Sequence, residues 1–251
     1  MSVFASLVAH LADLLQPLFH ASATAAAIVV FTALVRLAVH PLSRAAARGQ
    51  KAKARLSPQI AELRKKHAKN PDRMQKALME LHAKEKVSPF SGCLPSLLQV
   101  PAFFLMYHLF SSGQIGGEPN GLLAHTLFAA PLGDRWTDAL AHGGVFGGAG
   151  LVYVALFVIV AAVATYNYRR TKVQMAGAAM DQQVPGMGAM TKVMPLLSFA
   201  TLLTVAWVPL AAALYVVTST TWSAVERAFL YRDMPTAGAL ATAGMGVPPR
   251  P

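Results

Sequence analysis

Charged residues are scarce in this sequence of 251 residues, because Asp, Glu, Lys and Arg together make up only 13% of it. A soluble domain carries about 25% charged residues, and a disordered chain combines low hydrophobicity with high charge. With 55% hydrophobic residues, the chain fits neither an ordinary soluble enzyme nor a disordered protein. We therefore expect lipid to be its main solvent. The one cysteine, Cys93, excludes an internal disulfide.

Sequence motifs for covalent chemistry or metal binding are also missing. The chain has no Walker-type glycine loop, no serine in a nucleophile elbow, and no H-x-x-H or C-x-x-C pair. Its eight histidines are scattered, so we interpret them as interface or surface residues. The glycines between residues 143 and 150 are expected to allow close packing rather than to bind a ligand. The sequence thus predicts no enzyme activity, no metal and no cofactor.

Long apolar segments predict an all-α membrane protein with five transmembrane helices. A bilayer core needs about 20 apolar residues in a helix, with a working range of about 17–25. The segments that meet this need, or nearly so, are residues 19–42, 94–110, 149–167, 193–207 and 209–226. The last two are separated at Trp207-Val208-Pro209, because proline removes a backbone donor and clashes with the preceding turn.

The first 18 residues have a different pattern. Apolar residues recur there at helical spacing, while Ser6, His10 and Asp13 fall elsewhere. A cleavable signal would place basic residues before its apolar run, and none occurs here. We expect an amphipathic helix over residues 1–18 that lies on the membrane surface. The alternative is an uncleaved extension of the first span.

Loop charges predict the orientation of the spans, since cytoplasmic loops hold an excess of Lys and Arg. Residues 43–90 carry 13 basic and 4 acidic residues, and residues 168–192 carry a net charge of +3. Residues 111–148 carry a net charge of −2. With five spans, both basic loops fall on the cytoplasmic side and the acidic loop on the other. The N terminus is then outside, and residues 227–251 form a cytoplasmic tail that we expect to be disordered.

The basic segment 43–93 is predicted to form a cytoplasmic antiparallel hairpin of two short helices. Ser57-Pro58 and Asn70-Pro71 each place a capping residue directly before a proline at the first helical position. Such a basic arm can contact anionic lipid headgroups, at about 1 kcal/mol for each well-placed Lys or Arg. It can also contact ribosomal RNA through its phosphates, and charge alone does not choose between these partners.

Arg36 is the most informative residue, because it lies inside the first predicted span. At 1.5 Å per residue, it is about 12 Å deeper than Arg44, and burial of an arginine costs about 2.5 to more than 10 kcal/mol. No Asp or Glu lies in the interior of the predicted spans, so we expect Arg36 to be hydrated. The alternative is that its side chain snorkels to the cytoplasmic surface.

Polar residues on the first, second, fourth and fifth spans predict a shared hydrated groove around Arg36. The polar residues of any single span are also explained by hydrogen bonds between helices. Polar residues on four spans around one arginine, however, favour a shared groove. The candidate groove residues are Thr32, Arg36, Ser96, Gln99, Thr201, Thr204, Tyr215, Thr218, Ser219 and Trp222.

At this point the sequence resembles the YidC/Oxa/Alb family of membrane protein insertases. The resemblance rests on an ordered series of motifs, which are Val35-Arg36-Leu37 with Pro41-Leu42, Leu56-Ser57-Pro58, and Gly92-Cys93-Leu94-Pro95 with Gln99 and Pro101. The stretch from Val193 onward is similar to the family's final two spans. The resemblance covers about residues 1–232.

The resemblance implies a five-span core with a cytoplasmic helical hairpin. It also implies a groove that is open to the cytoplasm and the lipid but closed outside. In that family the arginine corresponding to Arg36 lies in the groove and is important in many members for inserting clients. The implied setting is a bacterial cell membrane, with nascent membrane proteins and lipid as partners, with or without the ribosome or the Sec translocon, and with no role for DNA.

Three departures from the family pattern are present. Leu-Ala-Ala-Ala-Leu-Tyr follows Pro209 where the family usually has a small-residue Pro-Ala-Gly motif, so we leave the packing there open. The sequence lacks the large extracytoplasmic domain of Gram-negative members and so resembles the short Gram-positive form. After the last span, only Arg227, Arg232 and Arg250 are basic, which argues against ribosome docking through a basic tail.

The sequence therefore predicts an insertase and membrane chaperone that works without covalent chemistry. The rival hypothesis is a small channel or transporter in which Arg36 binds an anion, although the internal inverted repeats typical of transporters are not seen. A third hypothesis, a purely structural scaffold, leaves an intramembrane arginine unexplained.

Overall fold

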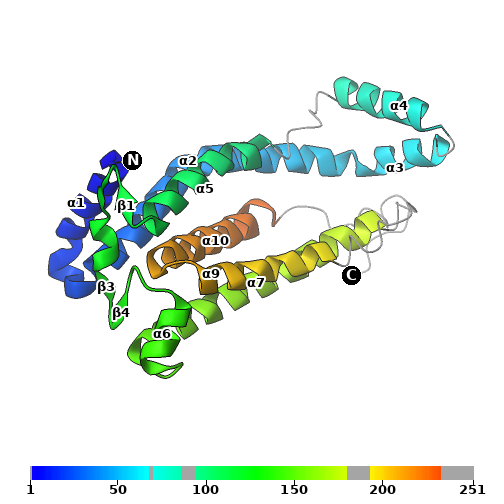
Figure 1. Ribbon diagram of the computed structural model, residues 1–251. Helices are drawn as coiled ribbons and strands as arrows, with labels where there is room; N and C mark the ends of the chain where they lie inside the picture. The colour runs from blue at the N-terminus through cyan, green and yellow to red at the C-terminus, as the bar shows by residue number, and fades with distance from the viewer. Residues whose placement is uncertain (1, 68–69, 86–93, 180–192, 233–251) are drawn as a thin grey trace. The chain divides into compact units, whose positions relative to one another are not determined.

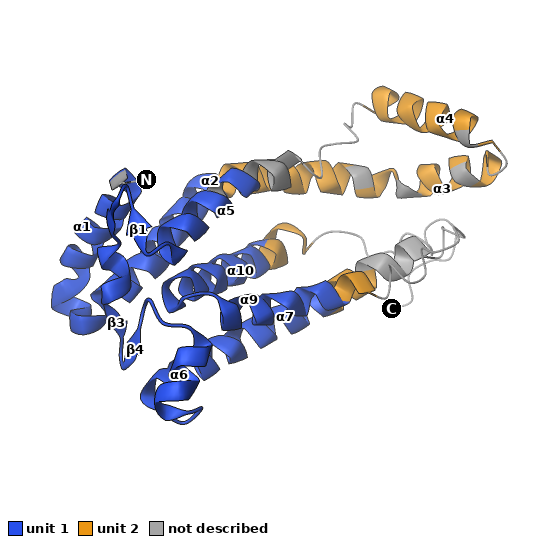
Figure 2. Cartoon of the chain, in the orientation of Figure 1, with its two compact units in different colours: residues 1–39, 99–168, 196–226 blue, residues 40–98, 169–195, 227–251 orange. Residues whose placement is uncertain are grey.

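The computed structural model describes residues 2–67, 70–85, 94–179 and 193–232, and most of these residues are helical (Figure 1). The chain divides into two compact units (Figure 2). Unit 1 contains residues 1–39, 99–168 and 196–226, and unit 2 contains residues 40–98, 169–195 and 227–251. The coarse prediction of an all-α membrane protein agrees with this helical content and with the apolar helices described next.

Every predicted span coincides with a helical segment, although the boundaries differ. The helices are α2 (Ala23–Arg55), α5 (Leu94–Ser111), α7 (Gly148–Ala179), the helical stretch Val193–Trp207 and α10 (Leu210–Leu230). The helices α2 and α7 continue about three turns beyond the predicted span ends, because alanines and basic residues with good helix propensity follow the apolar runs. Among the described residues, two stretches are long and apolar enough to cross a membrane, Val3–Ala52 and Gly148–Val173.

Residues Ser2–Phe19 form a helix, α1, as the apolar spacing predicts. The short 3-10 helix η1 (His20–Ser22) separates it from α2. His20 has a φ of +46°, a left-handed conformation that is uncommon for a residue other than glycine. This turn redirects the chain, so that α1 and α2 run in different directions (Figure 1).

The predicted break near Pro209 is confirmed, and residues of the loop 112–147, between α5 and α7, satisfy the first amides of α10. The 3-10 turn η3 (Leu197–Phe199) leads into α9 (Ala200–Trp207), and Val208 is extended with φ −90° and ψ 157°. The first amides of α10 lack partners within their own helix. Here Leu210 N donates to Asp134 O at 2.8 Å, and Ala211 N donates to Leu132 O at 2.9 Å.

The helix α10 forms the centre of unit 1. All eight residues from Leu210 to Val217 are buried. The three alanines that depart from the family's usual motif, Ala211, Ala212 and Ala213, are completely buried, so small side chains still let neighbouring elements approach α10 closely.

The acidic loop between α5 and α7 is folded, with short elements that the sequence analysis did not predict. It contains two antiparallel pairs, β1 (Gln114–Ile115) with β2 (Glu118–Pro119) and β3 (Thr126–Leu127) with β4 (Ala130–Pro131). The 3-10 helix η2 (Gly121–Ala124) lies between the pairs, and α6 (Trp136–Gly143) follows them.

Of the glycines expected to pack closely, Gly147, Gly148 and Gly150 do so, whereas Gly143 and Gly144 have open space around them. A Cβ added at Gly148 would lie 2.7 Å from Ala129 Cβ, and one at Gly150 would overlap the backbone oxygens of Gly144 and Val145. Backbone atoms cannot move aside as a flexible side chain can, so the start of α7 requires glycine at residue 150.

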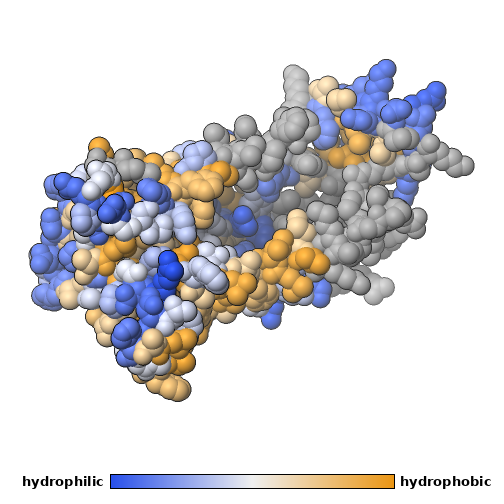
Figure 3. Space-filling view, in the orientation of Figure 1, coloured by the Kyte–Doolittle hydropathy of each residue, from blue (hydrophilic) through white to orange (hydrophobic). Residues whose placement is uncertain are grey.

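In unit 2, the helices α3 (Ser57–Lys66) and α4 (Pro71–Lys84) contact each other. Hydrophilic residues gather over α4 on the visible face (Figure 3). Asn70 caps α4 as predicted, since its side chain accepts a hydrogen bond from Arg73 N at 3.0 Å. The prediction that Ser57 caps α3 is wrong. The N-cap is Leu56, which is the one residue between α2 and α3, and its backbone is helical, so Ser57 already belongs to α3.

Candidate functional site

Two predicted groove residues meet in unit 1, although they are far apart in the sequence. Arg36 projects from α2, and its Nε donates a hydrogen bond to Ser219 Oγ of α10 at 3.0 Å. A second nitrogen of the same guanidinium, Nη2, also donates to this oxygen. Ser219 is 5% exposed, so it holds the arginine against a well-packed helix.

This contact joins a permanently cationic side chain to a neutral one. A guanidinium offers five N–H donors and no acceptor, whereas a serine hydroxyl is neutral and provides acceptor lone pairs. The two bonds from Arg36 to Ser219 therefore fix the position of the guanidinium without cancelling its charge. A carboxylate in the same place would form an ion pair instead.

Thr32 lies one turn before Arg36 on the same face of α2. It is buried, and its Oγ1 donates to Ile28 O at 2.7 Å. This bond to the preceding turn is a common way to satisfy a hydroxyl inside a helix. Thr32 thus places a satisfied polar side chain next to the arginine, and its direct role toward a client stays a prediction.

Aromatic rings of α5 pack against α10 one turn before Ser219. Tyr215 is buried, and its ring centroid lies 6.1 Å from that of Phe103 and 6.0 Å from that of Phe110. Both separations are typical of favourable aromatic pairs. The sequence analysis singled out Tyr215 but not its two phenylalanine partners, because nothing in the apolar run of α5 distinguishes them.

Trp222 lies one turn beyond Ser219 on α10 and supplies another hydrogen-bond donor. Its indole Nε1 is buried and forms no hydrogen bond with another described residue. A buried donor without an acceptor costs about 1–3 kcal/mol. Thr218, on the same part of α10, is partly buried.

The other predicted groove residues are not brought to Arg36 by any contact described here. On α9, Thr201 Oγ1 donates to Ser198 O at 2.9 Å and Thr204 Oγ1 donates to Ala200 O at 3.2 Å. Both hydroxyls therefore bond within their own helical segment, and their place in a groove stays a prediction. Ser96 and Gln99 belong to α5, but their side chains lie outside the described residues.

The side chains gathered at the site are suited to reversible binding. In the part of the chain that the structure describes, no group of three or more His, Cys, Asp or Glu side chains is placed to hold a metal ion. The groups gathered on α2 and α10 are a guanidinium, hydroxyls, a phenol and an indole. Such a set can attract an anionic or carbonyl-rich segment and hold it reversibly.

Comparisons with known proteins show which family the chain resembles. The family model described as 60Kd inner membrane protein matches residues 15–237. The membrane protein insertase YidC of Clostridium perfringens is 40% identical over 84 residues, which are 34% of this chain and 35% of the relative. The protein of the same name from Paraburkholderia phymatum is 39% identical over 102 residues, 40% of this chain and 18% of the relative. That of Geobacter metallireducens is 38% identical over 81 residues, 32% of this chain and 15% of the relative. In each case the match spans well under half of the relative.

Proposed function

This chain belongs to the YidC/Oxa/Alb family, the family of the 60Kd inner membrane protein, and from that premise we propose that it is a membrane protein insertase and chaperone of a bacterial cell membrane. Its substrates are nascent membrane proteins. The observation that carries the proposal is the cationic side chain of Arg36, which is hydrogen-bonded to Ser219 of α10 inside an apolar unit.

In the proposed mechanism, a hydrated groove lowers the cost of moving a client's polar tail partway across the bilayer. Arg36 attracts an acidic tail, and two unit charges 4 Å apart interact by about 1 kcal/mol in water and about 4 kcal/mol in a medium of dielectric constant 20. Trp222 offers its indole N–H to a carbonyl or carboxylate of the same segment. The attraction is strong enough to draw the tail into the groove and weak enough to let the tail leave it.

Lateral release into lipid supplies the driving force. Insertion gains about 0.3–0.6 kcal/mol for each Leu, Ile, Phe or Val at the centre of a client helix, so a whole span gains several kcal/mol without nucleotide. On α9, Leu203 and Trp207 are 73% and 80% exposed, and apolar residues gather over α7 and α9 on the visible face (Figure 3). This surface suits lipid or a departing client helix.

The finer architecture is part of the same proposal. Five spans with the N terminus outside place the basic segment that contains α3 and α4 in the cytoplasm. This helical pair would receive clients, with or without the ribosome or the Sec translocon. The acidic loop with its folded elements would then close the outer side of the groove.

Reconstitution in liposomes tests the proposal directly. The purified chain is supplied with a single-span client bearing an acidic tail, and protease protection reports translocation of that tail. We expect wild type and Arg36→Lys to insert the client and Arg36→Ala to fail. Arg44→Ala is the matched control, because Arg44 lies further along the same helix and is exposed.

Two outcomes would overturn parts of the proposal. If Arg36→Ala inserts the client as well as wild type, the charge of Arg36 has no role and the groove acts by hydration alone. If no variant inserts the client and wild type conducts anions, the channel hypothesis replaces the insertase.

A further inference from the structure

The helix α1 has three distinct faces, which follow from about 100° of rotation per residue. One face packs on the core of unit 1 through Phe4, Val8, Leu11 and Leu15. A second face is apolar but 51% to 75% exposed, and it consists of Val3, Leu7, Leu14 and Leu18. The third face carries small and polar residues, among them Ala5, Ser6, Ala9, Asp13 and Gln16. We call the second face the apolar stripe.

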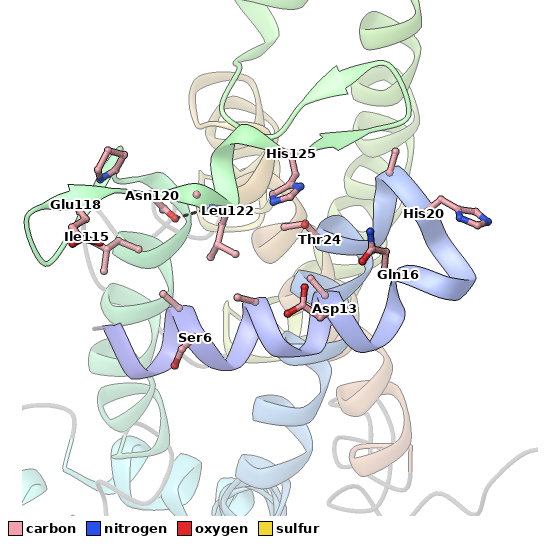
Figure 4. A pocket seen from close by; sticks show the side chains of 17 residues that line it. Ser6, Asp13, Gln16, His20, Thr24, Ile115, Glu118, Asn120, Leu122 and His125 are labelled. Carbon is pink, nitrogen blue, oxygen red and sulfur yellow. Dashed lines mark hydrogen bonds between the residues drawn. The ribbon is translucent and has the colours of Figure 1, made fainter.

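The third face of α1 forms the floor of a pocket of about 550 Å³. The roof is the outer loop from Ile115 to His125, so the whole pocket lies within unit 1 (Figure 4). The space exists because Ala5 and Ala9 project only methyl groups where longer side chains would fill it. The volume falls within the range of about 300–1,000 Å³ found for small-molecule sites.

Hydrogen bonds hold the roof in shape. Asn120 is buried, and its Nδ2 donates to Leu109 O and to Ser112 O, both at 2.9 Å. Its Oδ1 accepts from Leu122 N at 3.2 Å. Asn120 therefore uses its side chain to fix the loop to the end of α5, and the pocket is formed before any ligand binds.

The polar groups of the pocket favour a cation that carries N–H donors. Asp13 and Glu118 contribute carboxylates, while neither Lys nor Arg lines the pocket. Thr24 is only 3% exposed, and its side chain points into the pocket (Figure 4). Its hydroxyl forms no hydrogen bond with another described residue, so it is a buried polar group with capacity for a ligand. Gln16 and His125 supply donors for an anionic group beside the cation.

The apolar stripe indicates where such a ligand comes from. On the helical wheel of α1, Ser6 and Asp13 lie at the edge of the pocket floor nearest to the stripe. A lipid whose acyl chains lie along the stripe can therefore place its headgroup beside Asp13. We propose that the pocket binds a phospholipid whose headgroup carries a primary ammonium, in the leaflet against which α1 lies. The ammonium meets Asp13 and Thr24, and the phosphate meets Gln16 and His125, which lie at the same end of the pocket (Figure 4).

Lipid titration of the full-length protein tests this proposal, which requires α1 to lie at a lipid surface but does not require client insertion. The protein in detergent micelles is titrated with phosphatidylethanolamine, its N-methyl and N,N-dimethyl derivatives, and phosphatidylcholine, and bound lipid is counted by native mass spectrometry. All four headgroups are zwitterionic, so the series keeps the net charge while each step replaces one N–H donor by a methyl group. We expect about fivefold or greater preference for the primary amine over phosphatidylcholine, with a stepwise decline along the series.

Two variants test separately whether binding depends on the charge of the pocket and on its volume. Asp13→Asn keeps the shape and removes a carboxylate, whereas Ala9→Leu keeps both carboxylates and fills the floor. Both should abolish the preference, and the matched control Glu62→Gln, at an exposed carboxylate of α3, should keep it. Thermal unfolding of each variant checks that it is folded.

Three results would overturn the proposal. The first is equal binding of all four lipids. The second is full preference in folded Asp13→Asn and Ala9→Leu. The third is equal competition, per mole, by soluble phosphoethanolamine, which would assign the pocket to a soluble amine rather than to a lipid. Each result is independent of insertion activity, so it leaves the proposed function standing.

Discussion

The hydrogen bonds between Arg36 and Ser219 make a quantitative prediction for Ser219→Ala. Hydrogen bonds to a charged group contribute about 1.5–3 kcal/mol each to stability, net of hydration. Here both donors share one acceptor, so we count a single contribution. We therefore expect Ser219→Ala to lower the free energy of unfolding by about 2 kcal/mol. Alanine has a better helix propensity than serine by a few tenths of a kcal/mol, which offsets little of the loss.

A double-mutant cycle isolates this contribution from general effects of the substitution. In the Arg36→Ala background, the hydroxyl of Ser219 no longer accepts these bonds, so Ser219→Ala should cost less than about 1 kcal/mol. The difference between the two backgrounds, about 1–2 kcal/mol, is the coupling energy. Reversible unfolding in mixed micelles measures it for the four proteins of the cycle.

A serine one turn further along α10 provides the control. Ser223 Oγ donates to Ser219 O at 2.9 Å, which is a bond within the helix. Ser223→Ala should therefore cost the same free energy in both backgrounds. Equal costs of Ser219→Ala in both backgrounds would refute the reasoning, because the contact with Arg36 would then contribute nothing to stability.

Three further substitutions test the framework around the site by thermal unfolding in detergent. Asn120→Ala should cost about 2–4 kcal/mol, since it removes three hydrogen bonds of about 1 kcal/mol each, whereas Asn167→Ala on α7 should cost less than about 1 kcal/mol. Gly150→Ala should cost about 1–3 kcal/mol through overpacking, and Gly113→Ala, which has open space around it, should be tolerated. Tyr153→Phe should cost about 1 kcal/mol, because its hydroxyl donates to a backbone oxygen at 2.6 Å; an unchanged unfolding temperature would contradict this.

The sequence indicated the helices well because their signals are local. Apolar runs predict helices that the structure contains, and Pro209 predicts the break before α10. Asn70 is correctly predicted as a cap, since its extended backbone places the side chain over the amide of Arg73. Ser57 is not a cap, because a capping residue needs a non-helical backbone and Ser57 is already the first residue of α3. Residue type alone does not reveal that difference.

Contacts between distant segments were harder to predict. Arg36 and Ser219 were both placed in a polar groove, but their direct bond depends on how α10 is rotated against α2. The partners of Tyr215 on α5 were missed, because an evenly apolar helix has no periodicity that marks one face. The folded outer loop was missed as well, since its strands have two residues each and Asn120 fixes their surroundings through distant backbone groups.

Because Ser219 is a neutral acceptor, the charge of Arg36 and the packing of Arg36 can be separated by one further substitution. Ser219→Asp would place a carboxylate against the guanidinium and form a partly buried ion pair, so the folded state should be kept while the net charge of the site is cancelled. We expect translocation of an acidic client tail to fall about tenfold or more, which corresponds to the loss of about 1.4 kcal/mol of attraction, while a neutral tail is translocated at the wild-type rate. Protease protection with the two clients measures both rates. Undiminished translocation of the acidic tail by folded Ser219→Asp would mean that Arg36 does not act through its charge.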